Sequence, residues 1–150
     1  MKKSNISSSP VKKVKTEYFT GPVILHEISS ITRPKEHEMY HVIFKKSSRT
    51  KLHFHTGGQI LIVTGGKGSL VYYKKMNAGI SKFKISKTKT VNLASGDVVY
   101  IPARILHTHG SIRKNSVFSH LAVNFYSKNR KSITIWYESD LRSNVTSKIP

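Results

Sequence analysis

The sequence predicts an all-β protein with a single domain. Short segments rich in Val, Ile, Tyr and Phe follow one another along most of the chain, and turns containing glycine, serine or asparagine separate them. No window keeps apolar residues at a helical spacing over three turns. Short strands at this spacing, with turn residues between them, are typical of a β-sandwich or a small barrel.

Ten segments have the composition of β-strands. Turn residues lie between most of them, for example at Gly57-Gly58, at Gly65-Gly66 and at residues 127–129. In chain order, the segments are 22–28, 38–44, 51–55, 59–64, 69–73, 81–85, 90–93, 97–102, 117–125 and 133–137. We expect the last residues to form one helical turn or to trail off from the domain.

A polar, basic start and a short end bound the predicted domain. Residues 1–16 are rich in serine and lysine, a composition that favours disorder, so we expect a disordered basic tail that is dispensable for the fold. The predicted domain spans residues 17–140, followed by a C-terminal extension at 141–150. A chain of 150 residues is long enough for one domain with a hydrophobic core.

Composition limits the classes of partner. Lys and Arg number 26 against 7 Asp and Glu, a net charge of +19, but the basic residues are spread out and are not interleaved with aromatic residues. This arrangement argues against nucleic acid as the partner.

The chain has no cysteine, which excludes disulfides and zinc-thiolate sites. No apolar run approaches the roughly 18 residues of a membrane span, and the start lacks the apolar region of a signal peptide. We therefore expect a cytoplasmic protein.

One predicted strand is apolar on both faces. In residues 59–64, Leu61 and Val63 alternate with Ile60 and Ile62. Strands of this kind are covered on both sides. One side faces the interior of the predicted barrel, and the other fits contact with a second copy of the chain. The sequence therefore predicts a homodimer.

Two histidines lie two residues apart in another predicted strand. Residues i and i+2 of a strand point to the same face, about 6.8 Å apart. His53 and His55 can therefore converge on one metal ion, with bonds of about 2.1 Å. The Gly57-Gly58 turn lets the chain fold back, so that Gln59 can bring a neutral oxygen to the same ion. For this segment alone, two histidines that line the core are the simpler interpretation.

A second segment favours the metal site over two histidines that only line the core. In "GDVVYIPARILHTHG", residues 96–110, a glycine turn precedes a buried strand that ends at Pro102. His107 and His109 follow at strand spacing and share a face. The chain thus contains two separate pairs of histidines, each at the spacing that suits convergence on one ion.

These two segments resemble the two sequence motifs of the cupin superfamily. The first motif is His-x-His, three residues, Glu or Gln, six residues and Gly, and it corresponds to His53, His55, Gln59 and Gly66. The second is Gly, five residues, Pro, x-Gly, two residues and His, and it corresponds to Gly96, Pro102, Arg104 and His107. The resemblance covers residues 38–126. It implies the cupin double-stranded β-helix, a jelly-roll barrel, with a divalent metal ion bound by His53, His55, Gln59 and His107.

Two departures from the motifs bear on the chemistry. Arg104 stands where the second motif has a glycine, and Gln59 stands where a glutamate is usual. A set of three histidines and one glutamine is uncharged, so a bound divalent ion keeps its full charge. This favours Lewis-acid chemistry and an anionic or carbonyl-containing ligand, at some cost in metal affinity.

Within the cupins, the sequence is similar to a small single-domain group that includes manganese-bound hydroxynitrile lyases. The resemblance implies manganese, although iron, nickel and zinc also suit the ligand set. In that group, the second histidine of the His-x-His-Gly run and a histidine on the next strand lie in the cavity. These correspond to His109 and His120, which we expect to transfer protons.

Three functions are compatible with this interpretation of the sequence. The first is a small-molecule enzyme of the lyase type, in which the metal is a Lewis acid and His109 or His120 moves protons. The second is a binding or sensing protein that holds a ligand without converting it. The third is a metal-dependent dioxygenase, which the missing glutamate argues against. The two additional cavity histidines favour the enzyme, because holding a metal does not require them.

Overall fold

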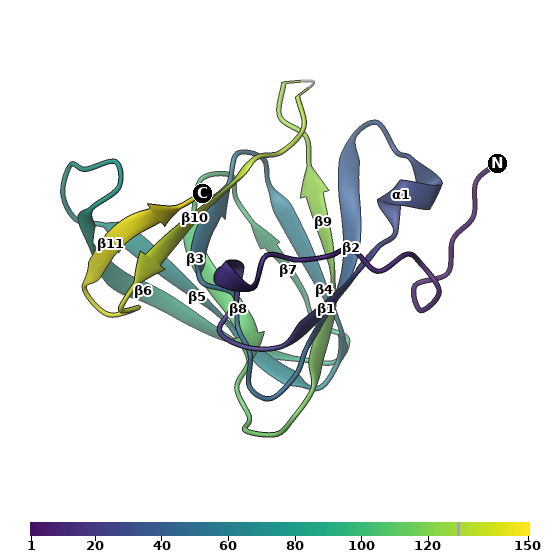
Figure 1. Ribbon diagram of the computed structural model, residues 1–150, viewed down its shortest axis with the longest axis horizontal. Coiled ribbons are helices and arrows are strands. Elements are labelled where there is room, and N and C mark those ends of the chain that lie inside the picture. Colours follow the sequence, from purple (N-terminus) through teal and green to yellow (C-terminus); the bar gives the residue numbers. More distant parts are fainter. Residues whose placement is uncertain (129) are drawn as a thin grey trace.

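We describe a computed structural model of the chain, which covers residues 1–128 and 130–150 (Figure 1). Strands dominate the described residues, which confirms the all-β prediction. The predicted turn at residues 127–129 lies partly outside them. The elements are η1 (Thr16–Tyr18), β1 (Val23–Glu27), α1 (Ser29–Thr32), β2 (His37–Phe44), β3 (Leu52–His55), β4 (Gln59–Gly65), β5 (Lys67–Lys75), β6 (Phe83–Ala94), β7 (Val98–Ile101), β8 (Leu106–Ser111), β9 (Phe118–Phe125), β10 (Thr134–Ser139) and β11 (Asn144–Ile149).

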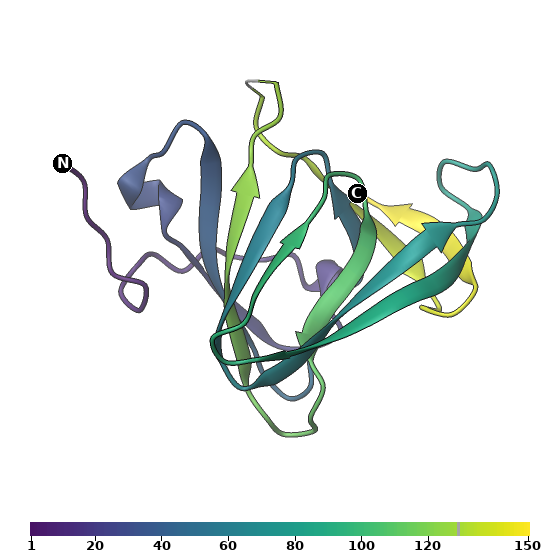
Figure 2. The ribbon, with the colours of Figure 1, turned by 180° about the vertical axis from the view of Figure 1, so that it is seen from behind.

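The strands form two antiparallel sheets. One sheet has five strands in the order β1-β2-β9-β4-β7, and the other strands close into a barrel in the order β10-β11-β6-β5-β8-β3. Figures 1 and 2 show the two sheets from opposite sides. Strands β3 and β8 carry three of the four predicted metal ligands and belong to the barrel. Strands β4 and β9 carry Gln59 and His120 and belong to the five-stranded sheet, so the site draws on both sheets.

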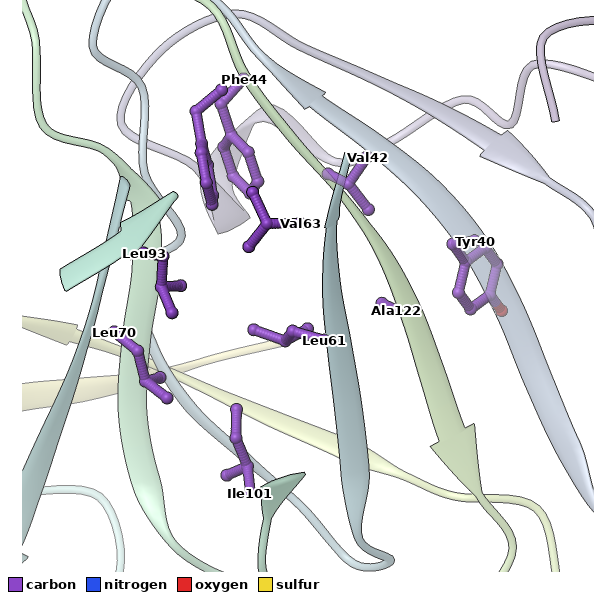
Figure 3. Packing of buried hydrophobic residues seen from close by; sticks show 10 residues of the cluster. Tyr40, Val42, Phe44, Leu61, Val63, Leu70, Leu93, Ile101 and Ala122 are labelled. Atoms are coloured by element: carbon purple, nitrogen blue, oxygen red, sulfur yellow. The ribbon is translucent and has the colours of Figure 1, made fainter. Parts of the chain in front are cut away.

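The main core fills the space between the two sheets. Alternate residues of β2 and β4 are buried, as the two-residue period of a strand requires. Figure 3 shows Leu61 and Val63 of β4 pointing toward Leu70 and Leu93, which come from the barrel strands β5 and β6. Leu61 is fully buried, and burial of such a side chain contributes about 1.5–3 kcal/mol. A second apolar cluster fills the barrel and is composed of Leu52, Val71, Tyr73, Phe83, Ile85, Leu106, Tyr137 and Val145.

Two local predictions were wrong, and one short element was not predicted. Segments 81–85 and 90–93 are parts of one strand, β6, because residues 86–90 alternate Lys with Ser and Thr and contain no glycine or proline to end it. Residues 144–149 form strand β11, which pairs with β10 and β6 and so completes the barrel. The predicted helical turn or free end is therefore not present there. The short helix α1 was not predicted, since four residues are too few for a helical period.

The predicted disordered tail packs against the domain over its second half. We call residues 10–19 the N-terminal strap. Its backbone bonds to β1 at both sides of Val11: the Glu27 amide donates to the Pro10 carbonyl, and the Lys12 amide donates to the Leu25 carbonyl, both at 2.8 Å. In Figure 1 the strap crosses the front of the molecule and ends in the η1 turn. The amino-acid composition of the segment did not predict these contacts, because backbone pairing depends little on side-chain type.

The outer face of the five-stranded sheet is apolar. Ile60 and Ile62 of β4 are half-buried, and the residues opposite them on β7, Tyr100 and Val98, are 60% and 61% exposed. This is the second apolar face that the sequence of β4 predicted.

The helices of the described chain are too short to be membrane spans. In residues 1–128 and 130–150, none has the length or apolar character to cross a bilayer.

Candidate metal centre and cavity

Strand geometry brings three histidines together. His53 and His55 lie on the same face of β3, while Phe54 between them points into the apolar cluster of the barrel. His107 of β8 is the direct cross-strand partner of His53. One nitrogen from each of the three rings lies within 4.8 Å of the other two, and all three rings are buried. Such a triad is suited to a divalent metal ion.

The backbone orients two of these rings. His53 donates from Nδ1 to the Lys51 carbonyl at 2.9 Å, and His107 donates from Nδ1 to the Ile105 carbonyl at 2.7 Å. A carbonyl oxygen can only accept, so the proton lies on Nδ1 and Nε2 presents a lone pair. The third ring, His55, bonds through Nδ1 to the Thr134 hydroxyl at 2.8 Å. Each bond directs an Nε2 atom toward the common centre.

Gln59 lines the same cavity as His53 and His55 and has a buried oxygen without a hydrogen-bond partner in the described chain. Its amide nitrogen donates to Oδ1 of Asn124 at 2.7 Å, which orients the side chain. Among the described residues, Oε1 of Gln59 and the Nε2 atoms of His55 and His107 are buried without a hydrogen-bond partner. Buried polar atoms are normally satisfied. Unpartnered acceptors on three neighbouring side chains are what a bound cation needs, so these residues fit a divalent metal.

A tight turn links the two motifs. Arg104 has a φ of 65°, in the left-handed region, which explains why the cupin motif has a glycine at this position. The backbone amide of Arg104 donates to the His55 carbonyl at 2.8 Å. This turn therefore holds the second motif against the first, at the cost of about 1 kcal/mol of strain for a residue other than glycine.

His109 and His120 form a second buried pair beside the triad. Nε2 of His120 lies 3.1 Å from Nδ1 of His109, and one of the two donates to the other. The rings of His109 and His53 have centroids 5.4 Å apart. Phe44 packs against both members of the pair. The two residues that were predicted to share the cavity with the metal are thus adjacent to each other and to the triad.

Two of the triad histidines and the His109–His120 pair line one cavity of about 380 Å³. His53, His55 and Gln59 contribute to one part of its wall, and His109 and His120 to another. The remaining lining comes from apolar side chains, from the N-terminal strap and from a few polar residues, among them Glu38 and Asn124. The strap and Trp136 of β10 were not predicted to take part. Side chains alternate along β10, so Trp136 and Thr134 share one face of the strand. This alternation could have indicated that Trp136 takes part in the site. A larger groove of about 570 Å³ lies elsewhere on the barrel, and its lining includes no histidine.

Burial keeps the five histidines neutral. It lowers the pKa of His55 to about 3, with help from the nearby His107, and the pKa of His107 to about 4. Burial likewise lowers the pKa of His120 to about 3. The pKa values of His53 and His109 also lie well below the usual range, first because of burial and then because of neighbouring imidazoles. All five are therefore uncharged at neutral pH, the state that binds metals and accepts protons.

We expect the metal-free protein to lose stability as the pH falls below about 6.5, the pKa of histidine in an unfolded chain. In the folded protein the pKa values of His55, His107 and His120 are lower, at about 3 to 4. Between pH 6.5 and pH 4 the unfolded chain therefore binds more protons than the folded chain. The free energy of unfolding has its full value above pH 6.5 and decreases as the pH falls toward 4. At pH 5.5 the three residues together lower the free energy of unfolding by about 4 kcal/mol. Urea unfolding at pH 7.5 and pH 5.5 measures this, and equal midpoints would contradict it.

An antiparallel β-barrel with a buried histidine triad suited to a divalent metal ion defines the class of protein. Residues 36–148 match the family model described as Cupin. The chain therefore belongs to the cupin family, and the cupin fold predicted from the two motifs is confirmed. No curated protein matches the chain significantly.

Solved structures agree with this assignment. A cupin-like protein of Thermotoga maritima has 29% identity and a TM-score of 0.63, over 85% of this chain and 84% of that one. A predicted oxalate decarboxylase of the same organism has 17% identity and a TM-score of 0.61, over 82% and 97%. Oxalate decarboxylase of Bacillus subtilis has 16% identity and a TM-score of 0.56, over 76% of this chain and 27% of that one. The last two similarities are those of fold alone.

Proposed function

We propose that this cupin is a metal-dependent enzyme that acts on a small molecule with a hydroxyl or carbonyl oxygen. The observation that carries the proposal is the buried His109–His120 pair, which lines the same cavity as His53 and His55 without belonging to the triad. Metal binding alone does not require this pair. Two additional neutral imidazoles beside a metal are the groups that proton transfer needs.

The proposed ligand set is His53, His55, Gln59 and His107. A divalent ion held there, manganese by resemblance, supplies a Lewis acid that polarises a substrate oxygen. Because the set carries no charge, the ion keeps its full attraction for an anionic or carbonyl oxygen. The role of the protein is to hold the substrate oxygen near the ion and its proton near His109.

The proposed chemistry is of the lyase type. When a hydroxyl compound splits into a carbonyl compound and a leaving group, the hydroxyl proton passes to a neutral imidazole, and the leaving group then takes up that proton. Nδ1 of His109 is engaged with His120, so Nε2 is the nitrogen that faces a substrate. Burial lowers the pKa of His109, which makes its protonated form a strong acid and favours the return of the proton.

Metal reconstitution followed by a substrate screen tests the proposal. Protein purified without an affinity tag is stripped of metal and then loaded with Mn²⁺, Fe²⁺, Ni²⁺ or Zn²⁺. We expect about one ion per chain, and metal-dependent cleavage of at least one cyanohydrin or other hydroxy compound. Stoichiometric metal with tight ligand binding and no product would favour the second candidate, a non-catalytic binding or sensing cupin. That alternative rests on the apolar wall of the cavity.

Replacing Gln59 by glutamate is expected to raise metal affinity by about tenfold and to weaken the binding of acetate to the loaded protein. The added carboxylate neutralises part of the ion's charge, and the number of charged ligands tunes affinity in protein metal sites. Competition with a chelating dye measures the metal, and calorimetry measures acetate. Asn124→Asp is the matched control, because it adds the same charge and keeps the acceptor for Gln59. An equal gain in both variants would remove Gln59 from the ligand set.

We also propose a homodimer that uses the outer face of the five-stranded sheet. Ile60, Ile62, Val98 and Tyr100 form a partly exposed apolar surface on adjacent strands. Light scattering is expected to give twice the 17.0 kDa mass of the chain. Ile62→Glu should yield monomers, whereas Ile133→Glu, at an exposed position outside this sheet, should not. A monomeric wild-type protein at micromolar concentration would contradict the proposal.

A further inference from the structure

The N-terminal strap forms the outer wall of the cavity. We infer that it is part of the ligand-binding site and selects small anionic molecules with an apolar body, whose charged group at the end distant from the metal contacts Lys13 and Lys15. The inference deepens the proposed function and rests on it for the metal at the inner end. The strap had been expected to be a dispensable tail.

The strap is fixed over the cavity at both of its ends. At the start, its backbone pairs with β1, and the Ser9 carbonyl lies 2.7 Å from Nδ1 of His26. At the end, the Lys51 amide donates to the Tyr18 carbonyl at 2.8 Å, just before the strand that carries His53. A segment fixed at both ends has a defined position, so its side chains can recognise a ligand.

An aromatic stack connects the strap to the metal site. The rings of Tyr18 and Trp136 are parallel, with centroids 4.5 Å apart. The other face of Trp136 is available to His53, whose ring centroid lies 4.2 Å away at an interplanar angle of 26°. The position of the strap is therefore set by packing against a residue that itself contacts a proposed metal ligand.

The cavity lining combines three kinds of side chain. One kind is the uncharged set of histidines and Gln59. A second kind is apolar, with Leu25, Val42 and Ala122 among the lining residues. The strap adds three lysines, Lys12, Lys13 and Lys15, against one acidic lining residue, Glu38. A ligand that matches this lining has an oxygen donor for the metal, an apolar body and a distal anionic group.

Two of the three strap lysines have no Asp or Glu partner in the described residues. Lys12 pairs with Glu27 at 3.5 Å, and Glu38 accepts a hydrogen bond from Tyr40 at 2.9 Å. In the described part of the chain, the Lys13 ammonium has no ion-pair or hydrogen-bond partner, and Lys15 donates to the main-chain oxygen of Pro150 at 3.2 Å. These two ammonium groups are thus not paired with acidic side chains and are the ones left for an anionic ligand.

The test compares adipate, which has a carboxylate at each end of an apolar body, with hexanoate, which has one. The full-length chain is titrated with and without Zn²⁺, and the fluorescence of Trp136, its one tryptophan, reports binding. We expect Lys13→Gln/Lys15→Gln to weaken adipate about tenfold and hexanoate less than about threefold, because two partly exposed charge contacts contribute about 1.4 kcal/mol. The difference is expected with and without the metal, since the lysines are not among the proposed metal ligands.

Two control variants separate a specific contact from general charge. Lys13→Arg/Lys15→Arg keeps the charges and should retain adipate affinity. Lys87→Gln/Lys89→Gln removes the same charge from β6, at exposed positions that do not line the cavity, and should leave both affinities unchanged. Equal adipate affinity in the wild type and the Lys13→Gln/Lys15→Gln variant, or an equal loss in the β6 variant, would overturn the inference. Failure of the wild type to bind Zn²⁺ would contradict only the proposed function.

Discussion

Replacing both His53 and His55 by alanine is expected to lower the affinity for divalent metal by about a thousandfold or more. The two rings supply two of the three converging imidazole nitrogens, and each ligand of a protein metal site contributes several kcal/mol. The remaining His107 and Gln59 cannot hold an ion at micromolar concentration. Elemental analysis of the dialysed protein measures the metal content, which should fall from about one ion per chain to nearly none.

A matched control keeps this result specific to the site. His37→Ala removes a histidine from the start of β2, outside the cavity lining, and should leave the metal content unchanged. Circular dichroism checks that both variants keep their strands. Unaltered metal content in the double variant, with the fold intact, would mean that the ion is held elsewhere.

The sequence was sufficient to predict the histidine triad but not the strap that lines the cavity. His53, His55 and His107 lie in two motifs whose internal spacing is set by strand geometry, so their convergence follows from local sequence. His120 was predicted to lie in the cavity from the resemblance to one group of cupins, and the structure places it against His109. Such predictions work because each motif residue is fixed by its own strand and turn.

The N-terminal strap shows where sequence reasoning failed. Most of it belongs to residues 1–16, whose lysine- and serine-rich composition is that of a disordered segment, yet the strap is held by backbone bonds to β1 and by the stack of Tyr18 on Trp136. Both contacts join residues distant in sequence. Composition describes the tendency of a segment in isolation, whereas these contacts exist only once β1 and β10 are in place. The pairing of strand β11 with β6 was missed for the same reason, because it joins Asn144 to Lys84, which are distant in sequence.

Replacing His109 by alanine is expected to lower kcat by 100- to 10,000-fold, about 3–5 kcal/mol of barrier, while the metal content stays at about one ion per chain. The physical reason is that His109 is a neutral imidazole in contact with the cavity and is hydrogen-bonded to His120 rather than to the proposed metal. The three converging nitrogens remain when it is removed. The measurement is kcat and KM on the substrate identified by the screen, with metal analysis of the same sample.

The decisive comparison is between His109 and its partner. His120 contacts a substrate less directly, because its Nε2 is engaged with His109, so His120→Ala should cause a smaller loss in kcat. His109→Asn keeps a polar group for His120 and guards against a loss of fold, since the alanine variant leaves a buried nitrogen unpaired. A positioning role for His109 would raise KM with little change in kcat, whereas proton transfer lowers kcat directly. Full turnover in His109→Asn, with metal bound, would assign the proton transfer to another group.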